Sequence, residues 1–377
     1  MQIDIRVASV PTKTKIWRLF PGEGYAFLND FRTENVGFLD YPGIILPDRP
    51  LKFWNEFDEN IIKSDVLSRF LRENGPNSRI KFDDIDTSAN RWSERRTRDK
   101  NSLINLFEEA RKGDLVVLPE QKWMGKIWIG QLKSNRVVYS RSPKRYGEYQ
   151  IPAREIAWSR GFPERMVSRA LSDSLRQVHP FALVEQSLYF ELFSLYFDSY
   201  VFKDRNASTI FNGEEFLDAD ASLLSNITKI AAAACIAIDY EDDGRSPLYE
   251  DLLGTILTNP PIEYTCSQES DIHSEGFTRL TSARLVPLVT SSLLASLILL
   301  SGCKDKKEMK SELGKIEYVN SSPYSDPACN ARVSRASALA LSFIGIDKTW
   351  EICKSARESA ARDIRPSARP HVRPHSK

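Results

Sequence analysis

The sequence predicts an α+β fold, in which a small curled β-sheet or pseudo-barrel with flanking helices precedes a mainly α-helical half. Four short apolar runs rich in Val, Ile, Trp and Tyr crowd into residues 113–158, separated by Gly, Ser, Asn and Pro, which is typical of consecutive antiparallel strands. Three later segments, residues 223–238, 285–300 and 333–346, are rich in Ala, Ser and Leu, as in closely packed helices. With 377 residues, the chain is long enough for two or three packed domains.

The charge of the chain is distributed unevenly. Residues 1–180 hold 31 Lys and Arg against 24 Asp and Glu, whereas residues 181–364 hold 17 against 27. Within residues 122–176, twelve basic residues stand against four acidic ones, among six Trp and Tyr. A basic surface with aromatic side chains suits a phosphate chain and stacked bases. The alternative is that the aromatic residues are core and the charges a solvated rim, and composition does not decide between them.

The N-terminal half alternates strands and helices. Apolar side chains recur at helical intervals in residues 60–73, which end at Asn74-Gly75-Pro76, and a second helix is expected to end at Gly113. Between them lies an Arg-rich stretch that contains Trp92. The elements expected in order are an arm or strand over residues 1–15, a strand over 16–19, a loop over 21–24, a helical turn over 25–31, a strand over 36–39, helices over 60–73 and 102–112, and strands over 115–118, 127–132, 137–139 and 149–158.

Taken together, these pieces resemble a known module. A Trp-bearing strand, a Gly loop, a Val-Gly-Phe strand, two helices, a Lys-Gly-Asp-Leu-Val-Val-Leu-Pro run, an Ile-Gly strand, a Tyr-rich hairpin and an Arg-x-Ile-x-Trp strand resemble the EVE/PUA-like module at the N-termini of some Mrr/McrB-type restriction and defence proteins. The resemblance covers roughly residues 15–185. The matching residues are Ile16–Arg18, Val36–Phe38, Lys112–Pro119, Ile127–Leu132, Tyr146, Tyr149 and Arg154–Trp158, with a tail at Arg169–Leu175 and Phe181–Val184.

The resemblance implies a pseudo-barrel that binds nucleic acid, in several members with a flipped and often modified base in an aromatic cage. Such a site needs aromatic faces for the base and basic residues for the flanking phosphates. Where relatives carry Gly-Trp, this chain has Gly37-Phe38, which leaves the stacking partner open, and Trp17 equally fits a core residue. By position, the residues expected at the pocket are Trp17, Phe38 and Trp92, with Trp123 and Lys126 on the loop beside it, and Arg141, Lys144 and Arg145 on the phosphates.

The second half has a different character. Residues 187–202 form either a long aromatic helix or two strands, and the three Ala- and Ser-rich segments predict a helical bundle. Residues 285–303 carry no charge, which suits a buried core helix or a borderline membrane span; their Pro and Ser, and the lack of flanking Trp and Tyr, favour the core. The basic Pro-rich residues 362–377 are expected to be a disordered tail that either assists polyanion binding or has no role.

Little in the sequence indicates catalysis. A restriction-type nuclease needs clustered carboxylates near a Glu-x-Lys or Asp-x-Lys. The carboxylates of residues 239–243 and 249–251 lack such a Lys, and the one Glu-x-Lys, Glu308 to Lys310, lies in a charge run typical of a solvated helix. No cofactor-binding motif occurs, because Gly22-Glu23-Gly24 is too short for a phosphate loop, and five widely spaced Cys predict neither a zinc site nor a disulfide framework.

These observations predict three parts: a PUA/EVE-like nucleic-acid-binding domain over residues 1–185, an acidic α-helical domain over 186–361, and the disordered tail. The expected function is that of a cytoplasmic protein that binds DNA or RNA. By resemblance, this protein would read a modified or flipped base in a bacterial restriction or anti-phage system. The helical domain would then oligomerise or contact an effector protein, without a cofactor or metal. A Mg²⁺-dependent nuclease and a membrane-associated effector are the alternatives.

Overall fold

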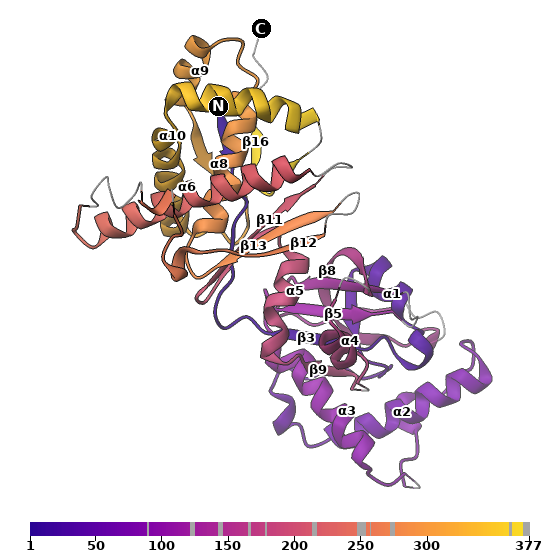
Figure 1. The fold of residues 1–377 in the computed structure, drawn as a ribbon. Helices are drawn as coiled ribbons and strands as arrows, with labels where there is room; N and C mark the ends of the chain where they lie inside the picture. Colours follow the sequence, from indigo (N-terminus) through magenta and orange to yellow (C-terminus); the bar gives the residue numbers. More distant parts are fainter. Residues whose placement is uncertain are drawn as a thin grey trace. The chain divides into compact units, whose positions relative to one another are not determined.

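The computed structural model separates the chain into two compact units (Figure 1). Lys13–Tyr196 form one, which we call the curled-sheet unit, and Met1–Thr12 with Phe197–Lys377 form the other, the helix–sheet unit. The residues that the structure describes are 1–88, 90–120, 125–141, 146–164, 167–177, 179–212, 217–246, 254–256, 258–271, 276–361 and 364–371.

The described part of the curled-sheet unit contains a seven-stranded mixed sheet. Its strands follow the spatial order β4-β8-β6-β5-β3-β9, and β7 also pairs with β8. The strand β3 runs parallel to β5, and the other pairs are antiparallel. The strands are β3 (Ile16–Leu19), β4 (Val36–Phe38), β5 (Leu115–Pro119), β6 (Lys126–Leu132), β7 (Val138–Ser140), β8 (Ile151–Pro163) and β9 (Phe181–Leu183).

The long strand β8 curls this sheet. Its first residues pair with β4 and β7, and its later residues, from 156 on, pair with β6. Arg154 is fully buried at this change of partner, and its guanidinium donates to the carbonyls of Leu106 (2.8 Å), Ala110 (3.2 Å) and Ser134 (2.6 Å). Burial is the main cause that lowers the pKa of Arg154 to about 10, so that it stays charged at neutral pH. Arg154 therefore fixes the end of the preceding helical segment to the sheet.

Helices flank the curled sheet, and one of them starts earlier than predicted. The predicted helix over residues 102–112 is wrong in its bounds, because α3 begins at Glu94, where the Ser93 side chain caps it by accepting from Arg96 N. Its exposed face is Arg-rich rather than apolar, so apolar spacing detects only its last turn. The helical elements are α1 (Leu28–Glu34), α2 (Phe57–Asn74), α3 (Glu94–Ile104), α4 (Arg169–Leu175) and α5 (Tyr189–Tyr196), with single turns η1 (Glu23–Tyr25), η2 (Leu51–Phe53), η3 (Phe82–Asp84), η4 (Asn105–Glu109) and η7 (Gln186–Leu188).

The helix–sheet unit packs three long helices on one another and on a sheet (Figure 1). One sheet has the order β12-β13-β11-β10-β2, with β15 on β11, and a second has the order β14-β1-β16. Its elements are β1 (Gln2–Asp4), β2 (Ala8–Ser9), β10 (Ser199–Phe202), β11 (Arg205–Phe211), α6 (Asp218–Asp242), η8 (Ile262–Tyr264), β12 (Ser267–Asp271), β13 (Phe277–Ser282), α8 (Val286–Leu300), α9 (Lys306–Leu313), β14 (Glu317–Val319), α10 (Pro327–Ala361), β15 (Arg365–Pro366) and β16 (Arg369–His371).

The structure of this half differs from the sequence-based expectation in several places. The part expected to be α-helical also contains two sheets, and the compact unit before it ends at residue 196, where the sequence suggested a boundary at 185. The first twelve residues belong here because β1 pairs with β14 and β2 with β10. Residues 364–371 of the predicted disordered tail form two strands whose backbone pairs with β11 and β1, and Ser367 and Ala368 are buried. Backbone pairing and small side chains stabilise a segment whose composition is polar.

The helix α8 is a core helix. It has 15 residues, nearly all buried against the other helices and β11, as the core alternative for residues 285–303 requires. Among the described residues, one helix, α6, is long and apolar enough to cross a membrane by length and composition. More than half of its most apolar window is packed inside the unit, so α6 is weak evidence for a span.

Candidate nucleic-acid interface

Two of the predicted pocket residues lie in the core of the curled-sheet unit. Trp17 stacks on Phe181 at 5.1 Å between ring centroids, and its indole nitrogen donates to Asp114 Oδ2 at 2.9 Å. Phe38 is fully buried and meets Phe31 edge-on at 4.7 Å. Each belongs to a short strand with no exposed side chain, so neither offers a face to a base in this structure. Of the two roles that the sequence left open for Trp17, the structure places it in the core.

The other predicted residues are separated from one another. Lys126 begins β6 and Arg141 follows β7, and both are exposed, with Arg141 beside the side-chain amide of Gln150. Trp92 lies before α3, and no recorded contact joins it to Lys126 or Arg141 in the described residues. Trp123, Lys144 and Arg145 lie outside the described residues.

Trp92 is an exposed aromatic side chain held in place. It keeps 39% of its surface exposed, and its indole nitrogen donates to Thr97 Oγ1 at 2.9 Å. The Lys100 ammonium lies 5.8 Å from the ring centroid and is paired with Asp58 at 2.6 Å. An exposed Trp with a fixed edge and a cation beside it offers a stacking surface at little cost in side-chain entropy.

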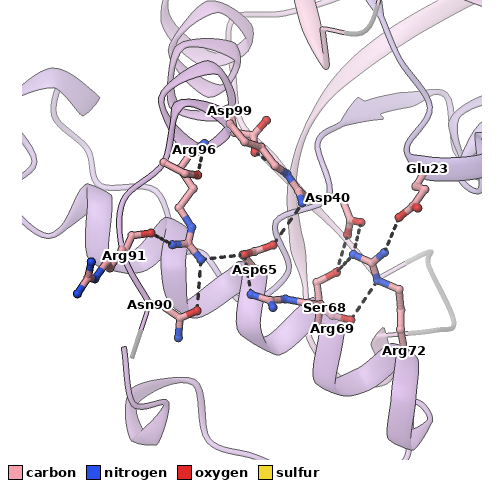
Figure 2. A network of polar contacts seen from close by, with 12 residues as sticks. Glu23, Asp40, Asp65, Ser68, Arg69, Arg72, Asn90, Arg91, Arg96 and Asp99 are labelled. Carbon is pink, nitrogen blue, oxygen red and sulfur yellow. Dashed lines mark hydrogen bonds and ion pairs between the residues drawn. The ribbon is translucent and has the colours of Figure 1, made fainter. Parts of the chain in front are cut away.

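A buried arginine fixes the loop that carries Trp92. The Arg96 guanidinium donates to the Arg91 carbonyl, to Asn90 Oδ1 at 3.4 Å and to Asp65 Oδ2 at 3.1 Å, as Figure 2 shows. Its side chain keeps only 10% exposure, so these partners replace water around the charge. The loop before α3 is thereby tied to α2.

Further arginines converge on the same carboxylate. Arg69 lies 3.0 Å from Asp65, and Arg95 lies 3.8 Å from it and 3.7 Å from Asp99. Arg69 and Arg95 keep 55% and 70% of their side-chain surface exposed. We use the name arginine surface for five exposed residues of this region: Arg69, Arg91, Trp92, Arg95 and Arg98.

The arginine surface is basic and polar enough to hold a phosphate. Residues 90–100 alone carry five Lys and Arg against two acidic residues. An exposed guanidinium group whose charge is only partly neutralised can donate two charge-assisted hydrogen bonds to the oxygens of one phosphate. From the sequence, Trp92 alone in this Arg-rich stretch was a predicted site residue. The signal that was available is the spacing of Arg95 and Arg98, which puts these two residues on one face of a helix.

Two groups on the buried side of this network, Asp99 and Tyr41, have shifted pKa values. Burial raises the pKa of the Asp99 carboxyl, while the hydrogen bond from Tyr41 and the nearby Arg95 oppose that rise. Burial also raises the pKa of Tyr41, and Asp99 adds to this rise. Further along the same face of α2, Asp40 lies 3.4 Å from Arg72 (Figure 2). Asp40 also accepts a hydrogen bond from Tyr146. These groups fasten α2 to the residues that follow β4.

The carboxylates considered for a nuclease are paired with arginines. Asp239 lies 3.5 Å from Arg284 and also pairs with Arg332, so α6 is joined to the neighbouring segments. Glu241 and Asp242 both pair with Arg335 at 2.9 Å. Residues 249–251 lie outside the described residues. Asp305 caps the start of α9 by accepting from Glu308 N, and the Glu308 side chain accepts from Lys304 N. Among the residues that the structure describes, no group of three or more His, Cys, Asp or Glu could hold a metal ion.

Comparison with other proteins adds no further assignment. No protein-family model, curated protein or solved structure matches this chain.

Proposed function

We propose that the curled-sheet unit binds nucleic acid through the arginine surface. In this proposal the chain is a cytoplasmic reader of DNA or RNA in a bacterial restriction or anti-phage system, with a modified or flipped base as preferred ligand. The setting and the modified base are supported by the resemblance of residues 15–185 alone. The helix–sheet unit would act as the effector or oligomerisation part.

One observation supports nucleic-acid binding best. Trp92 is exposed directly after the exposed Arg91 and shortly before the exposed Arg95 and Arg98 of α3, and the buried Arg96 fixes the loop that carries it. Because the indole is exposed and its edge is hydrogen-bonded to Thr97, one part of the ring is accessible for stacking on a base. Stacking on a base is worth about 1–3 kcal/mol, and arginines neutralise phosphates on both sides of it.

The test is binding of the full chain to labelled single-stranded and double-stranded DNA and RNA across a salt series. Trp92→Ala should weaken binding by about 5- to 150-fold if one base stacks on the ring. The double variant Arg95→Ala/Arg98→Ala should weaken binding to all sequences and reduce the slope of log K against log salt by about two, one for each lost phosphate contact.

A matched control removes the same charge elsewhere. Lys307 and Lys310 lie exposed on α9 in the helix–sheet unit, and Lys307→Ala/Lys310→Ala should leave affinity and salt slope unchanged. Modified bases are tested by competition with unmodified oligonucleotides. Wild-type affinity in both the Trp92 and the arginine variants would place binding elsewhere, and a chain that binds no nucleic acid at all would refute the proposal.

A further inference from the structure

A second aromatic side chain of the curled-sheet unit, that of Trp128, packs one face of its ring against the sheet. Trp128 in β6 stands opposite Gly161 in β8, and Gly130 stands opposite Trp158, so each indole covers a glycine on the neighbouring strand. A Cβ atom at Gly161 would come within 2.8 and 2.9 Å of two Trp128 ring carbons. The glycine therefore lets the indole rest against the strand backbone, which supports one face of the ring.

The edge of this indole is also fixed. Its nitrogen donates to Glu120 Oε1 at 2.8 Å, and the other oxygen of Glu120 accepts from the Lys126 backbone amide at 3.0 Å. Glu120 lies directly after β5, so one carboxylate ties the Trp128 ring to the ends of two strands. The ring thus has a defined position before any ligand binds.

The other face of Trp128 is covered by a single exposed cation. The guanidinium carbon of Arg32 lies 3.7 Å from the centroid of the ring, which puts it over the face, because an in-plane approach would overlap the ring atoms. Arg32 is exposed in the last turn of α1. Among the described residues no carboxylate lies within ion-pair distance of it, and no hydrogen bond of its guanidinium is recorded.

Two other Trp residues of this unit are stacked on a Phe instead. Trp17 is stacked on Phe181 inside the core, and Trp54 is stacked on Phe57. Over the Trp128 ring, by contrast, lies the planar and exposed guanidinium of Arg32. A stacked guanidinium occupies the space that a nucleobase would take, and the exposed Lys126 and Arg160 lie on the two strands that frame the ring.

We propose that Trp128 is a stacking site for an unpaired base, and that Arg32 leaves the ring face to contact a phosphate when the base enters. The inference rests on the proposed function, and it specifies the ligand as a nucleic acid with a single-stranded or extruded base. Glu120 is a positioning residue here, because it holds the indole and not the ligand.

The test uses the full chain and single-stranded oligonucleotides that carry one 5-bromouracil for photo-crosslinking. In the wild-type protein the cross-linked peptide should contain Trp128. Trp128→Leu should weaken binding of single strands by about 5- to 150-fold and affect a blunt duplex much less. Arg32→Ala should reduce the salt slope by about one, whereas Arg136→Ala, an exposed arginine of the same unit, should leave it unchanged.

The outcomes separate the two proposals. Trp128→Leu could unfold the sheet, but the cross-link in the wild-type protein and the exposed Arg32 variant do not depend on it. Cross-links only in other peptides, with an unchanged salt slope in Arg32→Ala, would overturn the Trp128 site. If Trp92→Ala still lost affinity in that case, the arginine surface would stand alone. Absence of any binding by the wild-type chain would overturn both.

Discussion

Asp65→Asn should have opposite effects on stability and on nucleic-acid affinity. Three arginines converge on this carboxylate, and the most buried of them, Arg96, loses a charged acceptor at 3.1 Å. A charge-assisted hydrogen bond contributes about 1.5–3 kcal/mol, and the exposed partners Arg69 and Arg95 contribute little. Because the Asn oxygen can still accept and Arg96 keeps its other partners, the unfolding free energy should fall by about 1–3 kcal/mol.

The same change should raise affinity for an anionic polymer. A negative charge about 7 Å from a bound phosphate costs about 0.6 kcal/mol in water and about 2.4 kcal/mol at an effective dielectric constant of 20. Its removal should therefore tighten binding by about 3- to 50-fold at low salt, with the smaller gain at physiological salt. The released guanidinium groups of Arg69 and Arg95 should also become free to contact phosphates.

Two assays measure these effects on one sample. Six of the seven Trp lie in residues 13–196, so Trp fluorescence in urea follows the curled-sheet unit, and anisotropy of a labelled single strand gives affinity. Glu73→Gln is the control, because Glu73 is exposed on α2 and holds no recorded ion pair. Lower stability together with unchanged or weaker binding in Asp65→Asn would refute the assignment of phosphates to this surface.

Three further predictions concern buried groups. Arg154→Met should lower the unfolding free energy by about 2–4 kcal/mol, because it leaves two buried carbonyls and one partly buried carbonyl without their donor. A loss below about 1 kcal/mol in urea would contradict this. Burial raises the pKa of Cys329 to about 11 and of Cys266 to about 12, so at pH 8 only about one in 1,000 to 10,000 of these thiols is ionised. These two thiols should therefore resist alkylation in the native chain and react in the denatured chain. Rapid labelling of the native chain would contradict this prediction. Burial raises the pKa of Asp99 in the folded state above its value in the unfolded chain. The protonated carboxyl therefore stabilises the fold below the unfolded-state pKa, and this stabilisation is lost as the pH rises through the folded-state pKa. Wild type should therefore lose stability relative to Asp99→Asn between acid and neutral pH, and the opposite trend would contradict the burial of this carboxyl.

The sequence predicted elements whose pattern is local. The strands β5 to β8 and the helices α2, α6 and α8 follow from apolar spacing and from the Gly and Pro residues between them. The α+β class therefore could be predicted. The pairing of β1 with β14 and of β16 with β1 joins residues more than 300 positions apart, and no local pattern contains that information.

The candidate site was harder to predict for a related reason. Trp17 and Trp92 have the same chemistry, and only the fold decides that one stacks on Phe181 while the other stays exposed. The role of Arg96 depends on Asp65, which lies on a different helix, and the cover of Trp128 by Arg32 joins α1 to β6. Such contacts are set by tertiary packing, so the residue types alone do not indicate which Arg or Trp faces solvent.

Hydrogen exchange of the full chain with and without a saturating single-stranded oligonucleotide tests the central claim most directly. The account predicts slower exchange of backbone amides in residues 90–100, with little change in the helix–sheet unit. Saturable binding that slows exchange elsewhere and leaves residues 90–100 unaffected would contradict it.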